Sequence, residues 1–434
     1  MELIREAFHY QSRFHRSTMV FKIDFPVTAH PLFPSMVKDL ALLSQTGFGV
    51  VIVPGAKEWI DDILGEYEIS LRYKGSTRIT SAKAMPFVQQ AAFHSATQFM
   101  TGFSGSRVDA IIGNFVRARG IGVIEGTDME HSGAVDKFYA DSLRRVLELG
   151  MVPILPCIGW SSSGKPYNVP SDEIALSAAA SLGAEKLFII SLSGGLKKDT
   201  YHIPEGIITA ETGRIIRLTP QEAVKVLESN PQGQTGEDKA LAELALAVKA
   251  CKAGVKRVHI IDGEEEGAVL KELFSNLGAG TMVYVDEYES IRGIRSRDIP
   301  DILRLMEPLM QQGILIRRKG EDIQNKKEDY AIFVIDGQVR ACGALHDWGE
   351  SQGEIAAIAT DPAYADMGLG RRIVRYLIDK AKRRGFTRVF ALTTRTQDWF
   401  ESLGFHESPQ ETLPERKRQQ YDHNRNSKVF SLDV

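Results

Sequence analysis

The chain of 434 residues has a formal net charge of −3 at pH 7, so no excess of basic residues favours nucleic acid as a partner. No apolar run in it approaches the ~20 residues that cross a membrane. Its three cysteines and ten histidines show no spacing typical of a disulfide or metal site, which predicts a cytoplasmic protein without a metal.

The first two thirds of the chain alternate predicted strands with predicted helices. Residues 2–16 interleave apolar and basic side chains at helical spacing, which predicts an amphipathic helix. The strands expected after it are 19–25, 50–53, 120–124, 152–156, 186–191, 256–261 and 281–285, and the helices are 32–45, 57–64, 239–253 and 266–277. Such alternation predicts a mainly parallel sheet with helices on both faces. A new strand at 291–297 precedes a helix at 299–311, so we expect two domains, 1–287 and 288–434.

A strand, a turn and a glycine-opened helix follow one another between residues 353 and 384. Gly368 and Gly370 let backbone amides approach a ligand at the helix start, where unpaired N–H groups and the helix dipole favour an anion. Apolar residues at helical spacing continue the helix, and Gly385 is expected to stop it. The sequence therefore predicts a phosphate site near 367–371, followed by a strand at 388–394 and a short helix at 396–405.

This segment resembles the acetyl-CoA site of the GNAT acetyltransferases, where a strand ending near Asp-Pro precedes Gln/Arg-x-x-Gly-x-Gly/Ala and a helix. Gly368 and Gly370 match, but Ala365 takes the place of the basic or Gln residue. A tyrosine that protonates the leaving thiolate in many GNAT enzymes is replaced by Phe400, which excludes a phenol acid there. The resemblance implies acetyl-CoA as cosubstrate, with contacts from Ile358, Thr360, Met367, Gly368, Leu369, Gly370 and Arg371.

The first part resembles the amino-acid kinase fold through four stretches, Lys74–Thr80, Tyr167–Asp172, Ala184–Ile190 and Ala250–Gly263. The glycine loops that hold phosphate in active kinases are replaced, one by Lys22-Ile23-Asp24-Phe25 and the other by Val53-Pro54-Gly55-Ala56. A Gly-Gly-Met-x-x-Lys segment is also missing, with residues 233–236 near its place. We therefore expect a retained ligand pocket without phosphoryl transfer.

The order of the two parts resembles the N-acetylglutamate synthase family. The resemblance implies an α/β chain, in which a three-layer amino-acid kinase-like domain with a mainly parallel sheet precedes an α+β GNAT domain. It implies transfer of acetyl from acetyl-CoA to the amine of L-glutamate, the first step of arginine biosynthesis. Its most specific marks lie at 313–318, 392–400, 413–417 and 424–429.

The same resemblance implies that Arg317 and Arg425 clamp the glutamate carboxylates and that Ser427 adds a hydroxyl, since a guanidinium pairs both oxygens of a carboxylate. The alternatives are a solvated strand end for Arg317 and a loose tail for Arg425 and Ser427, unless Val429 and Phe430 anchor that tail as an edge strand. Glu354 is implied as the base that deprotonates the amine through water, and its alternative is an exposed carboxylate at a strand start.

Two further groups complete the predicted chemistry. A backbone N–H near Ile358 is expected to stabilise the oxyanion, and Thr393 or Thr394 to supply a hydrogen bond. No metal is required.

The family resemblance also implies feedback by L-arginine, bound in the first domain by His259, Glu272 and Gly280. A solvated helix position is the alternative for Glu272. Residues 2–16 are expected to join copies of the chain into a homo-oligomer, with a hexamer suspected. Two other functions stay open: a GNAT enzyme acting on another amine, and a non-catalytic amino-acid sensor.

Overall fold

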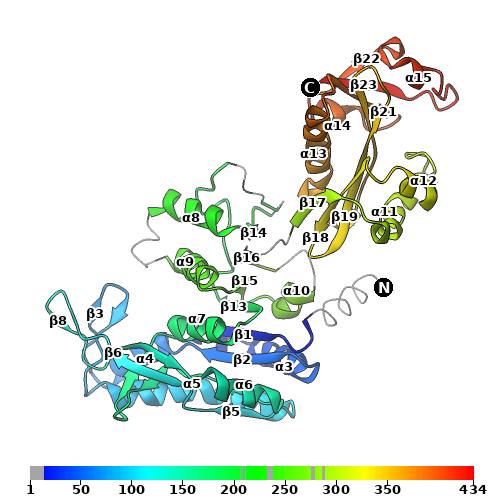
Figure 1. Ribbon diagram of the computed structural model, residues 1–434. Helices are drawn as coiled ribbons and strands as arrows, with labels where there is room; N and C mark the ends of the chain where they lie inside the picture. The colour runs from blue at the N-terminus through cyan, green and yellow to red at the C-terminus, as the bar shows by residue number, and fades with distance from the viewer. Residues whose placement is uncertain are drawn as a thin grey trace. The chain divides into compact units, whose positions relative to one another are not determined.

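The computed structural model describes residues 14–205, 207, 209–210, 212–231, 238–274, 279–285 and 289–434. The chain divides into two compact units, Met1–Asp286 and Glu287–Val434 (Figure 1). The helix predicted at 2–16 lies outside the described residues up to position 13, as do residues 233–236.

The first unit is built on an eight-stranded sheet in which all neighbouring strands run parallel except β15 and β16. Its order across the sheet is β14 (Arg217–Leu218), β16 (Thr281–Tyr284), β15 (Arg257–Asp262), β13 (Lys186–Ser191), β1 (Thr18–Ile23), β2 (Gly49–Pro54), β10 (Val152–Ile154) and β5 (Ala110–Ile112). The prediction of a mainly parallel sheet is confirmed.

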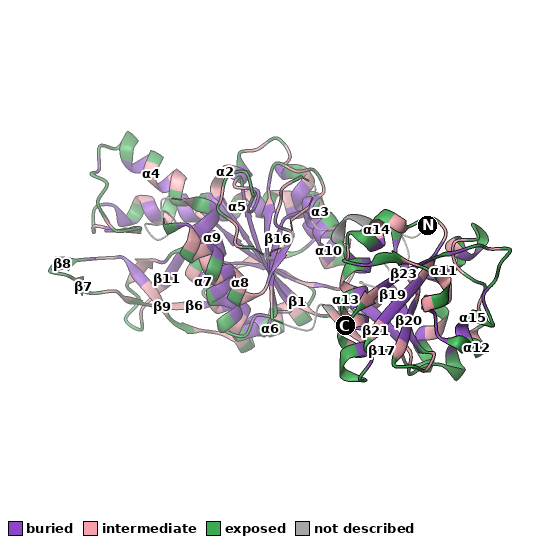
Figure 2. Cartoon of the chain, turned by 90° about the horizontal axis from the view of Figure 1, so that it is seen from above, coloured by how far each residue is buried: buried purple, intermediate pink, exposed green. Residues whose placement is uncertain are grey.

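Helices cover both faces of this sheet, because alternate strand residues point to opposite sides. In β1, Val20 joins the core under one set of helices, whereas Phe21 and Ile23 join the core under the other. The first set is α6 (Ala140–Glu148), α7 (Ser171–Leu182), α8 (Pro220–Ser229) and α9 (Lys239–Lys252), and the second is α3 (Phe33–Gln45), α5 (Met85–Gly105) and α10 (Ala268–Phe274). Figure 2 shows the buried residues gathered on the strands and on the inner faces of the helices.

Smaller elements extend the first unit beyond the ends of β1 and β2. A second sheet has the order β12 (Pro166–Asn168), β11 (Ile158–Trp160), β6 (Val116–Gly120) and β9 (Gly133–Phe138). Two hairpins, β3 (Tyr73–Lys74) with β4 (Thr77–Arg78) and β7 (Val123–Ile124) with β8 (Thr127–Asp128), accompany α2 (Phe25–Thr28) and α4 (Lys57–Glu66). The strand predicted at 120–124 is wrong, because positive-φ glycines at 122 and 126 break it into the β7–β8 hairpin.

The second unit is a seven-stranded sheet in which only β20 and β21 are parallel neighbours. Its order is β17 (Glu289–Gly293), β18 (Tyr330–Ile335), β19 (Gln338–Asp347), β20 (Gln352–Thr360), β21 (Arg388–Thr393), β23 (Lys428–Asp433) and β22 (His406–Ser408). The strand predicted at 291–297 therefore begins two residues earlier and ends at Gly293, where the short η2 helix (Ser296–Asp298) follows.

Two long helices pack on opposite faces of this sheet. Cys342 and Ala344 of β19 lie in the core under α11 (Ile299–Gln311), whereas Gly343 between them lies against Ile373 and Leu377 of α13. The remaining helices are α12 (Gly320–Asn325), η3 (Pro362–Met367), α13 (Leu369–Arg383), α14 (Gln397–Glu401), η4 (Gln410–Thr412) and α15 (Glu415–Arg418). Helix α13 matches its prediction, with Gly385 at φ 77° beyond its end, but α14 is shorter than the predicted 396–405.

Within the described ranges, no helix has the length and apolar character needed to cross a membrane. In the same part of the chain, no group of three or more His, Cys, Asp or Glu side chains is arranged to hold a metal ion. The three cysteines are buried free thiols.

Candidate active site

Strands β20 and β21 pair only where they begin. Hydrogen bonds join residues 352–354 to residues 388–390, although β20 continues to Thr360 and β21 to Thr393. Beyond Glu354 the two strands therefore separate and leave a wedge in the middle of the sheet. Backbone groups that line such a wedge lack a strand partner and are available to a ligand.

A β-bulge lies in β20 beside this wedge. Cys342 pairs with Ala359 and Ala344 pairs with Ala356, so one residue of β19 stands opposite two of β20, Ala357 and Ile358. Ala357 has a φ of 56°, in the left-handed region that non-glycine residues seldom adopt. The bulge takes backbone groups out of the ladder at the position where an oxyanion donor is predicted near Ile358.

Helix α13 begins at the far end of β20 with its first amides uncapped. Gly368 has a φ of 63° and precedes the helix, and no side chain of the described chain caps this end. A Cβ atom on Gly370 would lie 3.2 Å from the Trp399 ring and 3.5 Å from Thr360, so glycine keeps this approach open. The amides of Leu369, Gly370 and Arg371 thus form a ready site for an anion.

The other residues predicted to contact the cosubstrate differ in their surroundings. Arg371 is exposed and its guanidinium donates to the hydroxyl of Ser402 at 3.2 Å. Met367 closes the η3 turn, and its side chain is outside the described part of the structure. Thr360 ends β20 beside Gly370, and its contact with the cosubstrate stays a prediction.

A buried ion pair fixes the turn that leads into this helix. Arg340 of β19 donates to Asp361 at 2.7 Å and lies over the Tyr364 ring, while the other oxygen of Asp361 accepts from the Ala363 amide at 3.1 Å. Both charged side chains are at most 6% exposed. Sequence reasoning missed Arg340, because a single arginine in an apolar strand carries no motif.

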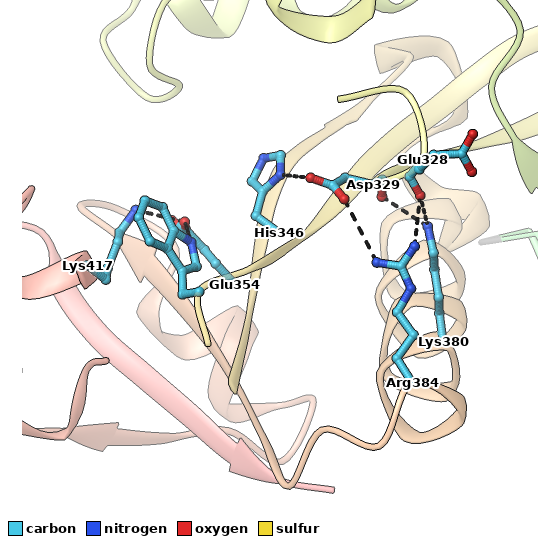
Figure 3. Close-up of polar contacts among 8 residues, drawn as sticks. Glu328, Asp329, His346, Glu354, Lys380, Arg384 and Lys417 are labelled. Atoms are coloured by element: carbon cyan, nitrogen blue, oxygen red, sulfur yellow. Dashed lines mark hydrogen bonds and ion pairs between the residues drawn. The ribbon is translucent and has the colours of Figure 1, made fainter. Parts of the chain in front are cut away.

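Glu354 lies at the vertex of the wedge and is 6% exposed. Its Oε2 atom accepts from the Trp348 indole and from the Lys417 ammonium, each at 2.7 Å (Figure 3). The alternative of an exposed carboxylate is wrong, because Glu354 is buried and pairs with a cation, and its role as the base stays a prediction. Both donors were missed, since Trp348 precedes the strand and Lys417 sits in a run of charged residues.

A second polar cluster in the same view joins α13 to the sheet. His346, which pairs with Glu354 across β19 and β20, contacts Asp329 at 2.7 Å through Nδ1 (Figure 3). From α13, Lys380 donates to the carbonyl oxygens of Glu328 and Asp329, at 2.6 Å and 3.2 Å. Arg384 adds a contact to the Glu328 carbonyl at 3.2 Å. These contacts hold the C-terminal end of α13 beside β18.

A cavity of about 570 Å³ opens past the end of β21. It brings together four predicted residues, Thr393, Thr394, Arg425 and Ser427, from two separate stretches of the chain. Glu354 does not line this cavity. It lies level with Phe390, three residues or about 10 Å before Thr393 along the strand direction.

The two threonines differ in what their hydroxyl groups do. Thr393 Oγ1 contacts Thr396 Oγ1 at 2.7 Å and accepts from the Thr396 amide at 3.0 Å, so it closes the turn before α14. Thr394 follows the strand in a bend and is half-buried. The predicted hydrogen bond from Thr393 or Thr394 stays a prediction.

Arg425 and Ser427 belong to an ordered turn, which rules out the loose tail. The Asp422 carboxylate accepts from the amides of Asn424 and Arg425, and the Tyr421 hydroxyl donates to the Ser427 carbonyl at 2.6 Å. Strand β23 then pairs with both β21 and β22, so Val429 and Phe430 anchor an inner strand and not the predicted edge.

The guanidinium of Arg425 has one nitrogen engaged and one buried without a partner. Its Nη2 donates to the Ile314 carbonyl, which ties the C-terminal turn to the segment after α11. Its Nε is buried and finds no hydrogen-bond acceptor among the described residues.

Arg317 lies in the segment that Arg425 contacts, but the strand predicted to end there is wrong. Residues 314–319 form no strand, because Gly313 ends α11 with a φ of 72° and the chain continues irregularly to α12. Arg317 is exposed there and does not line the cavity.

Phe400 is a core residue. It is 6% exposed and packs on Trp399, Phe405 and Phe430 at ring-centroid distances of 5.0, 5.4 and 6.5 Å. The exclusion of a phenol acid at this position therefore agrees with its apolar surroundings.

In the first unit, the structure brings His259, Glu272 and Gly280 together. Glu272 contacts His259 Nδ1 at 2.6 Å and accepts from the amides of Gly280, at 3.1 Å, and Ala279. Burial alone would raise the pKa of Glu272, but the bonds from His259 and the Ala279 amide hold it below its usual range. Glu272 is 7% exposed, so the expectation of a solvated helix position is wrong. Its carboxylate is already occupied by these three donors.

The first unit also contains a cavity of about 270 Å³, which lies at the carboxyl ends of β1 and β2. Lys22 pairs there with Asp24 at 2.5 Å and with Asp172 at 2.9 Å, and Asp24 also pairs with Lys239. Burial alone would lower the pKa of Lys22, but the nearby carboxylates raise it above its usual range. Lys239 is a second cation that sequence reasoning did not place at this pocket.

Comparison with known families agrees with this geometry. The amino acid kinase family model matches residues 25–262, and the acetyltransferase (GNAT) family model matches residues 299–406. An acetyltransferase domain of the GNAT class thus follows an amino-acid kinase domain.

Full-length relatives share both domains. The amino-acid acetyltransferase of Neisseria meningitidis serogroup B is 36% identical over 98% of this chain and 96% of the relative, and that of Escherichia coli K12 is 33% identical over 100% and 98%. The crystal structure of N-acetylglutamate synthase from Neisseria gonorrhoeae with coenzyme A and L-arginine is similar with a TM-score of 0.83 at 33% identity, covering 100% of this chain and 99% of that one. A second structure of that enzyme, with coenzyme A and N-acetyl-glutamate, matches over the same shares with a TM-score of 0.62 at 34% identity. The chain belongs to the amino-acid acetyltransferase family, that of N-acetylglutamate synthase.

Proposed function

We propose that this acetyltransferase moves the acetyl group of acetyl-CoA to the α-amine of L-glutamate. The observation that carries the proposal is the cavity past the end of β21 in which Thr394, Arg425 and Ser427 meet. A guanidinium and a hydroxyl at one end suit a carboxylate, and the wedge leaves backbone groups for a thioester. The related Neisseria gonorrhoeae enzyme, which binds coenzyme A and N-acetyl-glutamate, supports the same choice of substrates.

The elements around the wedge support one position for acetyl-CoA. Its pyrophosphate would take the uncapped amides of 369–371 and its thioester would lie along β20, with Ile358 and Thr360 beside it. The Arg340–Asp361 pair fixes the turn between these two sites, so the phosphate and thioester positions keep a constant separation.

The chemistry needs a neutral amine, because an ammonium has no lone pair for attack. Glu354 accepts the proton, directly or through water, and a backbone N–H at the bulge stabilises the oxyanion that forms on the acetyl carbonyl. Collapse expels the CoA thiolate, a fair leaving group since an ordinary thiol has a pKa of about 8.5. A hydrogen bond from Thr394 assists that step in place of a tyrosine.

Arg425 binds one carboxylate of glutamate, with Ser427 adding its hydroxyl. Arg317 is exposed in the segment whose Ile314 carbonyl Arg425 contacts, so it reaches glutamate only if that segment closes over the cavity. Arg317 is the proposed second contact to a glutamate carboxylate, provided that this segment closes over the cavity.

Release of CoA from acetyl-CoA, followed with a thiol reagent for several acceptors, tests the proposal. L-glutamate is expected to support release, with kcat/KM at least tenfold lower for L-aspartate, because one methylene is worth about 1 to 3 kcal/mol of discrimination. Equal values for aspartate would contradict the predicted clamp. Transfer to L-lysine alone would indicate a GNAT enzyme for another amine, and no release with any amino acid would favour a sensor.

We also propose that residues 1–287 bind L-arginine through the cluster of His259, Glu272 and Gly280, and that residues 288–434 carry the transfer. The support is the convergence of these three residues in a buried polar cluster, together with the arginine-bound relative. Because Glu272 is occupied by His259 and two amides, a guanidinium has to displace one of these donors. Calorimetry of the full chain with arginine tests this, and no heat at millimolar arginine would contradict it.

A cytoplasmic location and assembly of several copies remain part of the proposal. The free buried thiols of Cys157, Cys251 and Cys342 suit a reducing compartment. Residues 2–13, which carry the assembly hypothesis, lie outside the described structure, and the hexamer is tested by light scattering of the full chain.

A further inference from the structure

Lys417 is buried although its neighbours are not. It is 8% exposed, whereas Arg416 and Arg418 in the same short helix, α15, are exposed. An ammonium loses several kcal/mol of hydration on burial unless a partner replaces the water. Its partner is Glu354, whose Oε2 lies 2.7 Å from the Lys417 nitrogen.

The same ammonium also lies over the Trp348 ring, 4.4 Å from its centroid. The Trp348 indole donates to Oε2 of Glu354 as well, so the three side chains form a closed triangle. The turn between β19 and β20 supplies Trp348 and also holds α15, because Glu350 accepts from the Glu415 amide at 2.9 Å. The short helix that carries Lys417 and the ammonium at the end of its side chain are thus both held in place.

The triangle occupies one carboxylate oxygen of Glu354 and leaves the other available to the substrate. Oε2 receives two donors, so Oε1 is the oxygen left to accept a proton from the amine or from water. The facing titratable groups are Lys417 from α15 and His346 from β19, while β21 presents Phe390. His346 is already held by Asp329, which leaves Lys417 as the cation in contact with Glu354.

We propose that Lys417 is a positioning residue for the transfer reaction: its ammonium holds the Glu354 carboxylate turned so that Oε1 faces the acceptor. The inference rests on the proposed function, in which Glu354 is the base. Lys417 itself touches neither the acceptor nor the thioester.

The test compares kcat and KM for Lys417→Met, Lys417→Arg and the wild type. Without the ammonium, the Glu354 carboxylate loses a contact that sets its orientation, so kcat of Lys417→Met is expected to fall about tenfold or more while KM for acetyl-CoA stays nearly unchanged. Lys417→Arg keeps a cationic donor for Oε2 and therefore keeps most of kcat.

Two controls separate this role from a structural one. Arg418→Met changes an exposed cation of the same helix and leaves kcat and KM unaltered. In a Glu354→Gln background, Lys417→Met has no further effect on kcat, because the group it positions is gone. Circular dichroism checks that each variant is folded, and Lys417→Gln replaces the methionine variant if that one is not.

A wild-type kcat in a folded Lys417→Met or Lys417→Gln enzyme would overturn the inference, and so would a full additional loss in the Glu354→Gln background. Either result leaves the proposed function standing as long as the wild type acetylates glutamate. Failure of the proposed function shows itself differently, as a wild type without transfer to glutamate.

Discussion

Arg425 combines an anchored guanidinium with a buried Nε that the described residues leave without an acceptor. A buried donor of this kind costs about 1 to 3 kcal/mol until something accepts from it. A carboxylate of the substrate fits that requirement, because the Nη2 contact to Ile314 already fixes the plane of the guanidinium.

We therefore predict that Arg425→Lys raises KM for glutamate at least tenfold and leaves KM for acetyl-CoA within about twofold. Lysine keeps the charge but loses the planar pair of donors, worth roughly 1.5 to 3 kcal/mol for a charged partner. Steady-state kinetics with each substrate varied in turn measures both constants. Arg388→Lys, which alters a surface pair with Asp433, is the control, and an unchanged KM for glutamate would remove Arg425 from the site.

Single residues were predictable where backbone geometry or a short pattern dictates them. Gly368 and Gly370 were found because a helix start needs open backbone, and the positive φ of Gly368 agrees. Arg317 was misjudged because an apolar run resembles a strand locally, while a glycine ends the preceding helix. Lys417 and Trp348 reach Glu354 only through the folded chain, so no spacing in the sequence indicates them.

Glu272 links helix α10 to the backbone at residues 279–280. The Glu272 side chain accepts from the amides of Ala279 and Gly280, and His259 on β15 supplies the third contact. Burial lowers the pKa of His259, which keeps its ring neutral near pH 7 despite the neighbouring carboxylate. The carboxylate therefore organises the segment in which arginine is proposed to bind.

Glu272→Ala is expected to weaken arginine binding at least tenfold and to lower the thermal stability of the first unit. Two buried amides and the His259 ring lose their acceptor, at roughly 1 to 3 kcal/mol for each unsatisfied group. Transfer without arginine is expected to stay close to that of the wild type. Calorimetry and thermal unfolding of the full chain measure the two effects, with exposed Glu264→Ala as the control. Wild-type arginine affinity in the variant would exclude this cluster.

Helix α13 was predicted from its apolar spacing, whereas helix α5 was not. Helix α5 has no charged residue between Met85 and Gly105, so its polar face shows only Gln, Ser, Thr and His against the apolar one. Its Gly102 packs on Val37, a contact between helices that spacing does not reveal. The bulge at Ala357 likewise depends on pairing with β19 and leaves no mark in an alanine-rich strand.

At the scale of the whole molecule, the chain combines an amino-acid kinase domain with an acetyltransferase domain. The Lys22 pocket retains paired charges, but Asp24, Phe25 and Pro54 stand where flexible glycine loops would cradle phosphate. Without such loops, a transferring phosphoryl group finds few backbone donors.

We predict that ATP with N-acetylglutamate yields no ADP above the background of an enzyme-free control. A coupled assay for ADP on the full chain measures this, and an authentic acetylglutamate kinase serves as the positive control. Sustained turnover would mean that the charged residues of the Lys22 pocket suffice for phosphoryl transfer and that the chain has two activities.

The central claim is that Glu354 removes the proton from the acceptor amine at the wedge of the second unit. The most direct test is kcat of Glu354→Gln at saturating acetyl-CoA and glutamate, with the affinity for CoA measured alongside and exposed Glu401→Gln as the matched control. A neutral amide cannot accept the proton, so kcat is expected to fall about 10²-fold or more while CoA binds as in the wild type. A kcat equal to that of the wild type would contradict the claim.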